Sequence, residues 1–122
     1  MSVRAITSLH DARLTGINYL ENRKIQLEFT KVDLSKAIIC LNGVVNFFCS
    51  GMLEGNIVLS VEILDAEDIS TDDMVYFVEK EERGQSVANL QKAIHERGLC
   101  MLLLSPSYGA ELACVCSAVT EQ

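Results

Sequence analysis

Two histidines are the residues of this chain best suited to acid–base chemistry, and each stands beside an acidic residue, as His10-Asp11 and His95-Glu96. A carboxylate that orients an imidazole can produce a general base. Neighbouring residues of a strand point to opposite faces, so we expect Asp11 to bind backbone donors in a turn and His10 to be a partly buried polar residue. No second histidine stands four residues from His95, the spacing of zinc proteases, so we expect it on a solvated helix face.

The five cysteines form an odd set without a Cys-x-x-Cys pair, and four of them sit in apolar stretches: Cys40, Cys49, Cys100, Cys114 and Cys116. This usage is typical of reduced, buried thiols in a cytosolic protein. Cys114 and Cys116 would share one face of a strand, but the chain offers no second ligand pair at zinc spacing. The sequence therefore predicts neither a metal site nor another cofactor.

A third group of polar residues, Ser105-Pro106-Ser107-Tyr108-Gly109, has the composition of a turn. No Gly-x-Ser-x-Gly, phosphate-binding glycine loop or dinucleotide motif occurs in the chain. We therefore do not expect an enzyme. The alternative is a small-ligand module or enzyme with a pocket between sheet and helix, to which His10, Ser107 and Tyr108 would contribute polar groups.

Length and composition predict one domain over residues 1–122, because 49% of the 122 residues are apolar and such a chain buries a core without disulfides. Ten Lys and Arg against 17 Asp and Glu give a formal charge of -7, the wrong sign for nucleic acid or an anionic membrane. Apolar runs such as 99–104 are shorter than the ~18 residues of a membrane span, and no secretory signal is visible. We expect a cytoplasmic protein.

The negative charge is confined to one half of the sequence. Residues 1–64 hold six bases and six acids, whereas residues 65–122 hold four bases and eleven acids. Eight of those acids crowd into positions 65–82: Asp65, Glu67, Asp68, Asp72, Asp73, Glu79, Glu81 and Glu82. This acidic stretch is either a solvated surface that maintains solubility or the docking face for a basic protein partner.

The spacing of hydrophobic residues predicts the strands of residues 1–64. Residues 12–42 read as a three-strand antiparallel meander with short polar connections, and residues 25–30 alternate regularly. Residues 57–64 form a further strand that aims Ile57, Leu59, Val61 and Ile63 at the core. Residues 44–49 are apolar on every side, and we expect a loop or helical turn there.

In the second half, Ser86 and Gly98 bracket a helical spacing of apolar residues, so we expect a capped helix over 87–97. Residues 71–83 are β-rich at 74–78, which favours a strand, with a helix as the alternative. Residues 99–104 and 112–119 read as buried strands joined by the turn at 105–109. Their apolarity indicates either central strands or a homodimer interface.

Together these elements predict an α+β fold, a mostly antiparallel sheet of about five to seven strands with one or two helices packed against it.

The segments Leu9-His10-Asp11-Ala12-Arg13-Leu14, 41–47 and 54–59, with 106–112 as a further match, resemble a loose group of small uncharacterised bacterial proteins that open with a His-Asp-Ala strand. Some of that group are immunity proteins of polymorphic toxin systems. The resemblance implies a bacterial, cytosolic, single-domain protein that binds another protein, and it carries over no catalytic residues. Nuclease toxins are commonly basic, so the acidic stretch would suit that role.

The hypothesis that follows is a non-enzymatic, protein-binding domain that uses the acidic stretch as its contact surface. A homo-oligomeric structural subunit is the remaining alternative.

Overall fold

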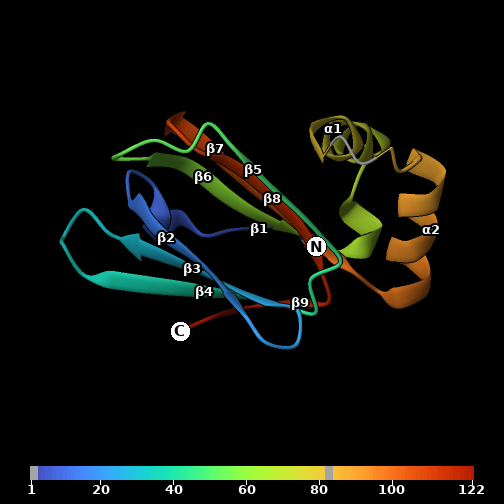
Figure 1. Ribbon diagram of the computed structural model, residues 1–122, viewed down its shortest axis with the longest axis horizontal. Helices are drawn as coiled ribbons and strands as arrows, with labels where there is room; N and C mark the ends of the chain where they lie inside the picture. The colour runs from blue at the N-terminus through green and yellow to red at the C-terminus, as the bar shows by residue number, and fades with distance from the viewer. Residues whose placement is uncertain (1–2, 82–83) are drawn as a thin grey trace.

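The computed structural model describes residues 3–81 and 84–122 (Figure 1). Over these residues the chain forms nine strands, two α-helices and two 3-10 turns, η1 and η2. In chain order they are β1 (Val3–Ala5), η1 (Thr7–Leu9), β2 (Arg13–Leu20), β3 (Lys24–Thr30), β4 (Lys36–Asn42), β5 (Asn46–Ser50), β6 (Ile57–Leu64), η2 (Ala66–Asp68), α1 (Thr71–Glu81), α2 (Val87–Arg97), β7 (Cys100–Tyr108), β8 (Glu111–Cys116) and β9 (Ala118–Glu121).

The strands form one antiparallel sheet in the order β5-β8-β7-β6-β2-β3-β4-β9, and β1 pairs with β6 beside this path. Within the described residues, β2 meets β6 through a single pair, Arg13 and Ile57. Because only this pair joins β2 to β6, the sheet can bend at that point into two halves that face each other. Figure 1 shows these halves diverging, with β5, β6, β7 and β8 in one and β2, β3, β4 and β9 in the other.

The main core fills the space between the two halves. Leu27 and Phe29 of β3 and Leu41 of β4 face Leu102 of β7 and Leu112 of β8, and all five are fully or almost fully buried. Such burial of apolar surface is the dominant stabilising contribution to folding.

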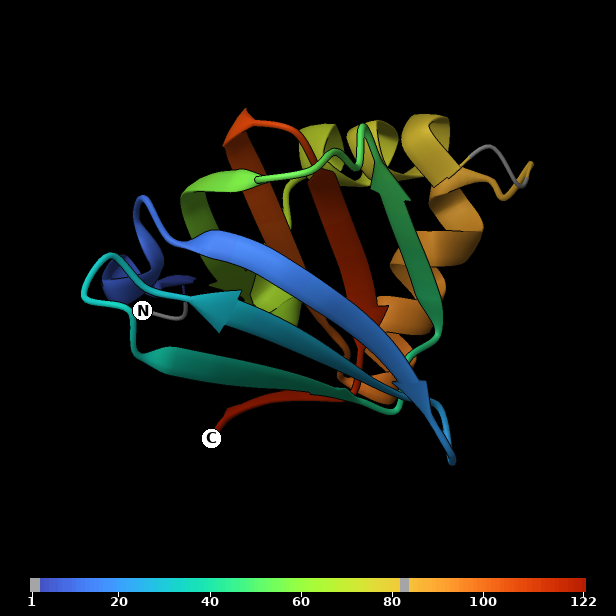
Figure 2. The same ribbon diagram turned by 60° about the vertical axis from the view of Figure 1, so that its left-hand side comes forward.

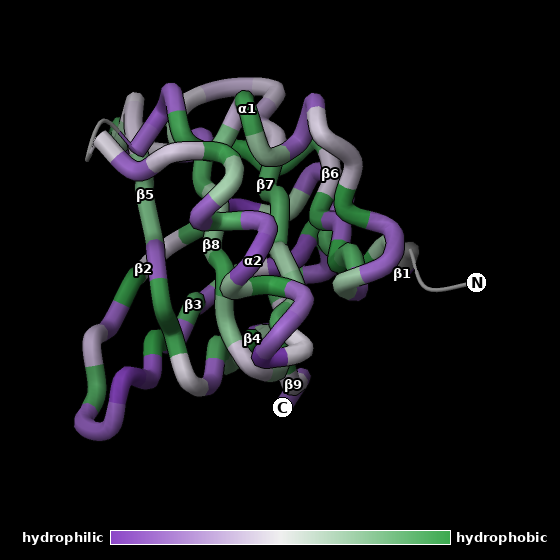
Figure 3. Tube along the Cα trace, turned by 90° about the vertical axis from the view of Figure 1, so that its right-hand side faces the viewer, coloured by the Kyte–Doolittle hydropathy of each residue, from purple (hydrophilic) through white to green (hydrophobic). Residues whose placement is uncertain are grey.

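A second core lies on the outer face of the β5-β8-β7-β6 half, where both helices pack (Figure 2). Phe77 of α1 and Leu90 and Ile94 of α2 are buried against Met101 of β7 and Val115 of β8. Figure 3 shows the consequence, because apolar segments concentrate in the strands beneath the helices while the tip of the β2–β3 hairpin is polar. Strands β7 and β8 are thus covered on both faces.

This double coverage accounts for the apolar residues at 100–104 and 112–116, which belong to the central strands β7 and β8. The predicted turn at 105–109 is displaced, since residues 105–108 continue β7 and Gly109, with φ +88°, begins the turn. The predicted strand 112–119 is interrupted at Ser117, whose N–H donates to the carbonyls of Asn42 and Gly43. The chain thereby leaves β8 and crosses to β4 as β9.

The expected five to seven strands were too few, because the described residues form nine. Strand β1 is three residues long and pairs only with a strand far away in sequence, which periodicity does not detect. Strand β5 occupies the segment expected to be a loop or helical turn. It is apolar on both sides because one face packs toward β2 and the other toward α1.

Residues 71–81 form the helix α1, so the favoured strand over 71–83 was wrong within the described residues. The decisive signal precedes the segment: the Ser70 hydroxyl accepts from the Asp73 N–H at 3.0 Å, and the Asp73 carboxylate accepts from the Ser70 N–H at 3.0 Å. This reciprocal cap fixes the first turn. Met74 and Phe77 are then buried at helical spacing, which outweighs the β propensity of Val75.

The 87–97 helix has the expected bounds and caps, with Ser86 accepting from the Asn89 N–H and Gly98 in the left-handed region. In β6, by contrast, the expected core position of Leu59 was wrong, because a register irregularity between Val58 and Ser60 turns Leu59 outward. Val58 takes the core position instead. Over the described residues, no helix is both long and apolar enough to cross a membrane.

Candidate functional site

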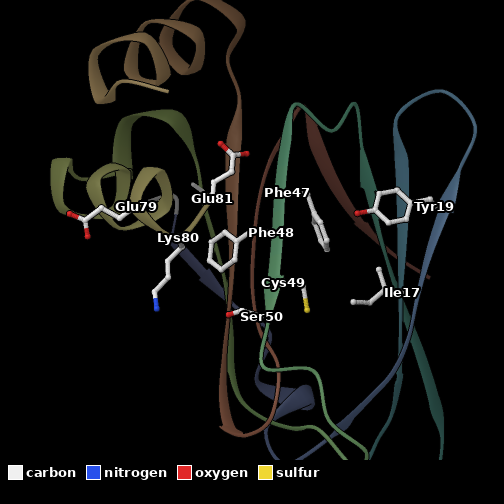
Figure 4. Close-up of a pocket in the computed structure, with 9 residues that line it drawn as sticks. All are labelled: Ile17, Tyr19, Phe47, Phe48, Cys49, Ser50, Glu79, Lys80 and Glu81. Atoms are coloured by element: carbon white, nitrogen blue, oxygen red, sulfur yellow. The ribbon is translucent and has the colours of Figure 1, made fainter. Parts of the chain in front are cut away.

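An open groove of about 970 Å³ runs along the unpaired edge of β5, and we call it the β5 groove (Figure 4). It is lined by residues of β2, β5 and α1: Ile17, Tyr19, Phe47, Phe48, Cys49, Ser50, Glu79, Lys80 and Glu81. Within the described residues β5 pairs with β8 on one side and with no strand on the other. The groove therefore combines a free strand edge with two flanking walls of different chemistry.

The alternation of β5 divides its side chains between the two walls. Figure 4 shows Phe47 and Cys49 directed toward Tyr19 and Ile17, whereas Phe48 lies on the side of α1. Phe48 is 8% exposed and packs at ring-centroid distances of 6.0 Å from Tyr76 and 5.7 Å from Phe77. The strand is thus anchored to the helix through one face and leaves the other face toward β2.

The wall formed by β2 is apolar and exposed. Tyr19 is 72% exposed and meets Phe47 edge to face with ring centroids 5.9 Å apart. A backbone hydrogen bond of 2.8 Å from the Val44 N–H to the Arg23 carbonyl ties the β2–β3 turn to the segment before β5, which holds this wall in place. Burial raises the pKa of the Cys49 thiol, so its thiolate is scarce at neutral pH.

The wall formed by α1 is charged. Lys80 approaches the Glu111 carboxylate at 3.4 Å, and the Tyr76 hydroxyl donates to the other oxygen of Glu111 at 2.5 Å. Burial first, and then the hydrogen bond and charge of Glu111, raise the pKa of Tyr76 far above its ordinary value. Glu79 is exposed on the outer side of the helix, while the carboxylate oxygens of Glu81 are buried.

These side chains are suited to binding. Aromatic rings and a free strand edge recognise an extended chain, and the acids favour a basic one. The one thiol in the lining is a weak nucleophile because its pKa is raised, and no histidine among the lining residues stands ready to activate it.

The acidic stretch does not form a single patch. Asp65, directly before η2, and Glu67, within η2, line a separate hollow with Arg4. Asp72 and Asp73, at the start of α1, line another with Glu111. At the other end of the helix, Glu79 and Glu81 line the β5 groove.

The other members of the stretch have various placements. Asp68 is half-buried at the end of η2. Asp73 caps α1, so its carboxylate has a structural partner. Glu82 lies outside the described residues.

The three residues expected to supply a ligand pocket are not brought together. His10 lines a hollow of about 360 Å³ whose other residues come from 5–7 and 59–61. Tyr108 is 53% exposed at the end of β7, and the Ser107 hydroxyl donates to the Ile57 carbonyl at 3.5 Å. The space between sheet and helices is instead filled by side chains such as Phe77 and Leu90.

His10 and Asp11 lie in a turn, so their side chains do approach each other, contrary to the strand argument. His10 Nε2 is 3.6 Å from an Asp11 oxygen, and Nδ1 is 2.8 Å from the Leu59 carbonyl. A carbonyl only accepts, so Nδ1 must donate. The Nδ1 hydrogen bond to the Leu59 carbonyl therefore fixes the orientation of the ring.

All five cysteines fall in the described residues, and all are free thiols, four of them buried. Cys114 and Cys116 share a face of β8, as expected, and Cys100 joins them from β7 with its sulfur 3.8 Å from that of Cys116. The hydrogen bond to Cys116 and burial raise the pKa of Cys100. For Cys116, the opposing effect of Cys100 is outweighed by Cys114 and burial, so its pKa is raised too. These thiols are inert core residues.

The sequence did not single out Tyr19, Phe47 or Phe48 as site residues. The signal that could have found them is an apolar segment, 44–49, that matches neither a loop nor a one-faced strand. Such a segment is explained by a strand at the edge of a sheet with packing on both faces.

Comparison with known proteins bears on the fold. A crystal structure of an uncharacterised protein from Neisseria gonorrhoeae superposes with a TM-score of 0.59 at 11% identity, covering 100% of this chain and 98% of that chain. At this identity the likeness shows a similar fold and nothing about activity. No sequence-family description and no curated protein matches the chain.

Proposed function

We propose that this chain is a non-enzymatic protein-binding domain that holds a basic segment of its partner in the β5 groove. The observation that carries the proposal is the exposed aromatic wall beside a free strand edge: Tyr19, at 72% exposure, stands over Phe47 at the rim of the groove. Tyrosines in such positions supply much of the binding energy of protein interfaces.

Charge favours a basic partner over a second copy of the chain. The wall of the groove carries Glu79, which is exposed on α1, and Glu111, whose carboxylate pairs with Lys80. The whole chain has a formal charge of -7. Two copies meeting at this groove would bring like charges together, whereas a basic segment is attracted to it.

The resemblance to immunity proteins supports a basic toxin as the partner. In this proposal the chain acts in the bacterial cytoplasm, a compartment in which thiols like its five cysteines stay reduced. The acidic stretch then contributes mainly through Glu79 of α1, which is exposed beside the groove, and less through the more distant Asp65 and Glu67.

Selection from a displayed library of random heptapeptides tests the proposal. We expect the immobilised chain to enrich peptides of net positive charge. Tyr19→Ser should lower the affinity for the enriched peptides about tenfold, the effect of removing one interfacial tyrosine. Glu79→Lys should slow association severalfold at low salt and much less at high salt.

Two matched variants serve as controls. Tyr108→Ser removes an exposed tyrosine away from the groove, and Glu96→Lys reverses an exposed acid on α2. Neither should change the affinity by more than about twofold, since surface substitutions outside an interface contribute little. Enrichment no better than on a blank support, or binding that ignores Tyr19→Ser, contradicts the proposal.

A further inference from the structure

We propose that the partner segment adds to β5 as an extra strand, and that its side chains alternate between apolar residues facing β2 and basic residues facing α1. This inference rests on the proposed function and specifies the form that the bound segment takes. It follows from the free edge of β5 and from the different chemistry of the two walls.

The free edge supplies main-chain partners. Strand β5 spans Asn46–Ser50 and hydrogen-bonds to β8 on one side, in a register that pairs Phe47 with Cys114 and Ser50 with Glu111. Alternate N–H and C=O groups of an antiparallel strand point to its opposite edge, where they can accept another strand. Five residues extend roughly 17 Å, enough for a segment of about five residues.

The walls specify the side chains of that segment. A strand lying beside β5 continues its pleat, so its residues point alternately toward β2 and toward α1. Those that point toward β2 meet Tyr19, Ile17 and Phe47, which favour apolar groups. Those that point toward α1 approach Lys80 and its partner Glu111, with the exposed Glu79 on the outer side of the helix, a wall of net negative charge.

Two other free edges of the described sheet, those of β9 and β1, lack these features. Strand β9 has four residues, of which three are exposed and none is aromatic. Strand β1 is three residues long. Short polar edges of this kind resist pairing. Compared with β1 and β9, β5 thus offers a longer edge that is flanked by an apolar wall.

A set of synthetic peptides tests strand addition on the intact chain by calorimetric titration. The parent alternates four lysines with three valines, and a charge control replaces every lysine with glutamate. Two further peptides carry N-methyl groups, on the valines in one and on the lysines in the other. Because alternate residues of a strand direct their N–H groups to opposite edges, only one methylation pattern blocks the edge that would pair with β5.

We expect the parent to bind, the glutamate peptide to fail, and one methylated peptide to bind about 100-fold more weakly than the other, since it loses three hydrogen bonds. Tyr19→Ser should weaken the parent, and Tyr108→Ser should not. Equal effects of the two methylation patterns, with Tyr19 still required, overturn strand addition and leave the protein-binding groove intact.

Two other outcomes would contradict more than the mode of strand addition. If neither the parent nor any library-selected peptide depends on Tyr19, both the strand addition and the proposed function are wrong. If light scattering shows a dimer that Tyr19→Ser abolishes, the occupant of the edge is a second copy of the chain, and the basic segment is excluded.

Discussion

Asn56 is a buried polar residue directly before β6, and replacing it tests the packing described here. It is 3% exposed, and its Oδ1 accepts hydrogen bonds from the Leu53 N–H at 2.8 Å and the Ala110 N–H at 3.0 Å. These bonds join the loop that follows β5 to the turn that precedes Glu111 on the charged wall. The side chain therefore holds two segments that have no sequence proximity.

The expected cost of Asn56→Ala follows from the fate of the two donors. Ala110 is 1% exposed, so its N–H would lose its partner without gaining water, which costs about 1–3 kcal/mol. Leu53 is 51% exposed, so its N–H can be hydrated and the loss is nearer 1 kcal/mol. We expect the free energy of unfolding to fall by about 2–4 kcal/mol, a large share of the ~5–15 kcal/mol of an ordinary domain.

Equilibrium unfolding in urea measures this loss, which at a typical slope of about 2 kcal/mol per molar urea lowers the midpoint by roughly 1–2 M. Asn89→Ala is the matched control, because Asn89 is exposed on α2 and its cap bond uses the backbone N–H. That variant should stay within about 0.5 kcal/mol of the parent. A loss below about 1 kcal/mol for Asn56→Ala would refute the role assigned to its two hydrogen bonds.

Three further predictions concern other positions. Gly109→Ala should cost more than Gly55→Ala in urea unfolding, because both have positive φ but a Cβ at Gly109 would collide with Asn56 whereas the space at Gly55 is open; equal losses would contradict this packing. Because the pKa of Tyr76 is raised, its neutral form stabilises the folded state fully below its ordinary pKa of 10.0, and this stabilisation is lost as the pH rises above that value. Tyr76→Phe should therefore flatten the decline of the free energy of unfolding above pH 10. An unchanged slope would contradict the raised pKa of Tyr76. Cys49 should be the first thiol alkylated in the native protein, more slowly than in the unfolded chain because its pKa is raised, and the parent peptide should protect it; mass spectrometry after timed alkylation identifies the site, and earlier reaction of a buried cysteine would count against the described burial.

The parts of the fold that sequence predicted are those with local signals. Ser86 and Gly98 define α2 through their own caps, and the alternation at 25–30 identifies β3 without reference to distant residues. Helix α1 was predicted only as the alternative to a strand, because its cap, Ser70, stands before a segment of high β propensity. Strand β5 was missed because its two apolar faces are explained by β2 and α1, which contact it from remote parts of the chain.

The same reasoning applies to the candidate site. The acidic stretch is visible as composition, but its division among η2, the start of α1 and the end of α1 depends on a helix that the sequence indicated only as the alternative. The aromatic wall joins Tyr19 to Phe47, which lie 28 positions apart in the printed sequence, across a sheet that folds over itself. No local sequence pattern predicts this contact between Tyr19 and Phe47.

Hydrogen exchange of the β5 amides, followed by NMR with and without the lysine–valine parent peptide, tests the central claim most directly. Peptide bound as an added strand must protect alternate amides within Asn46–Ser50, because those N–H groups gain partners at the free edge. Tyr19→Ser should reduce this protection. Binding that leaves every β5 amide unchanged, or that protects only α2 or the region of Asp65 and Glu67, would contradict the account.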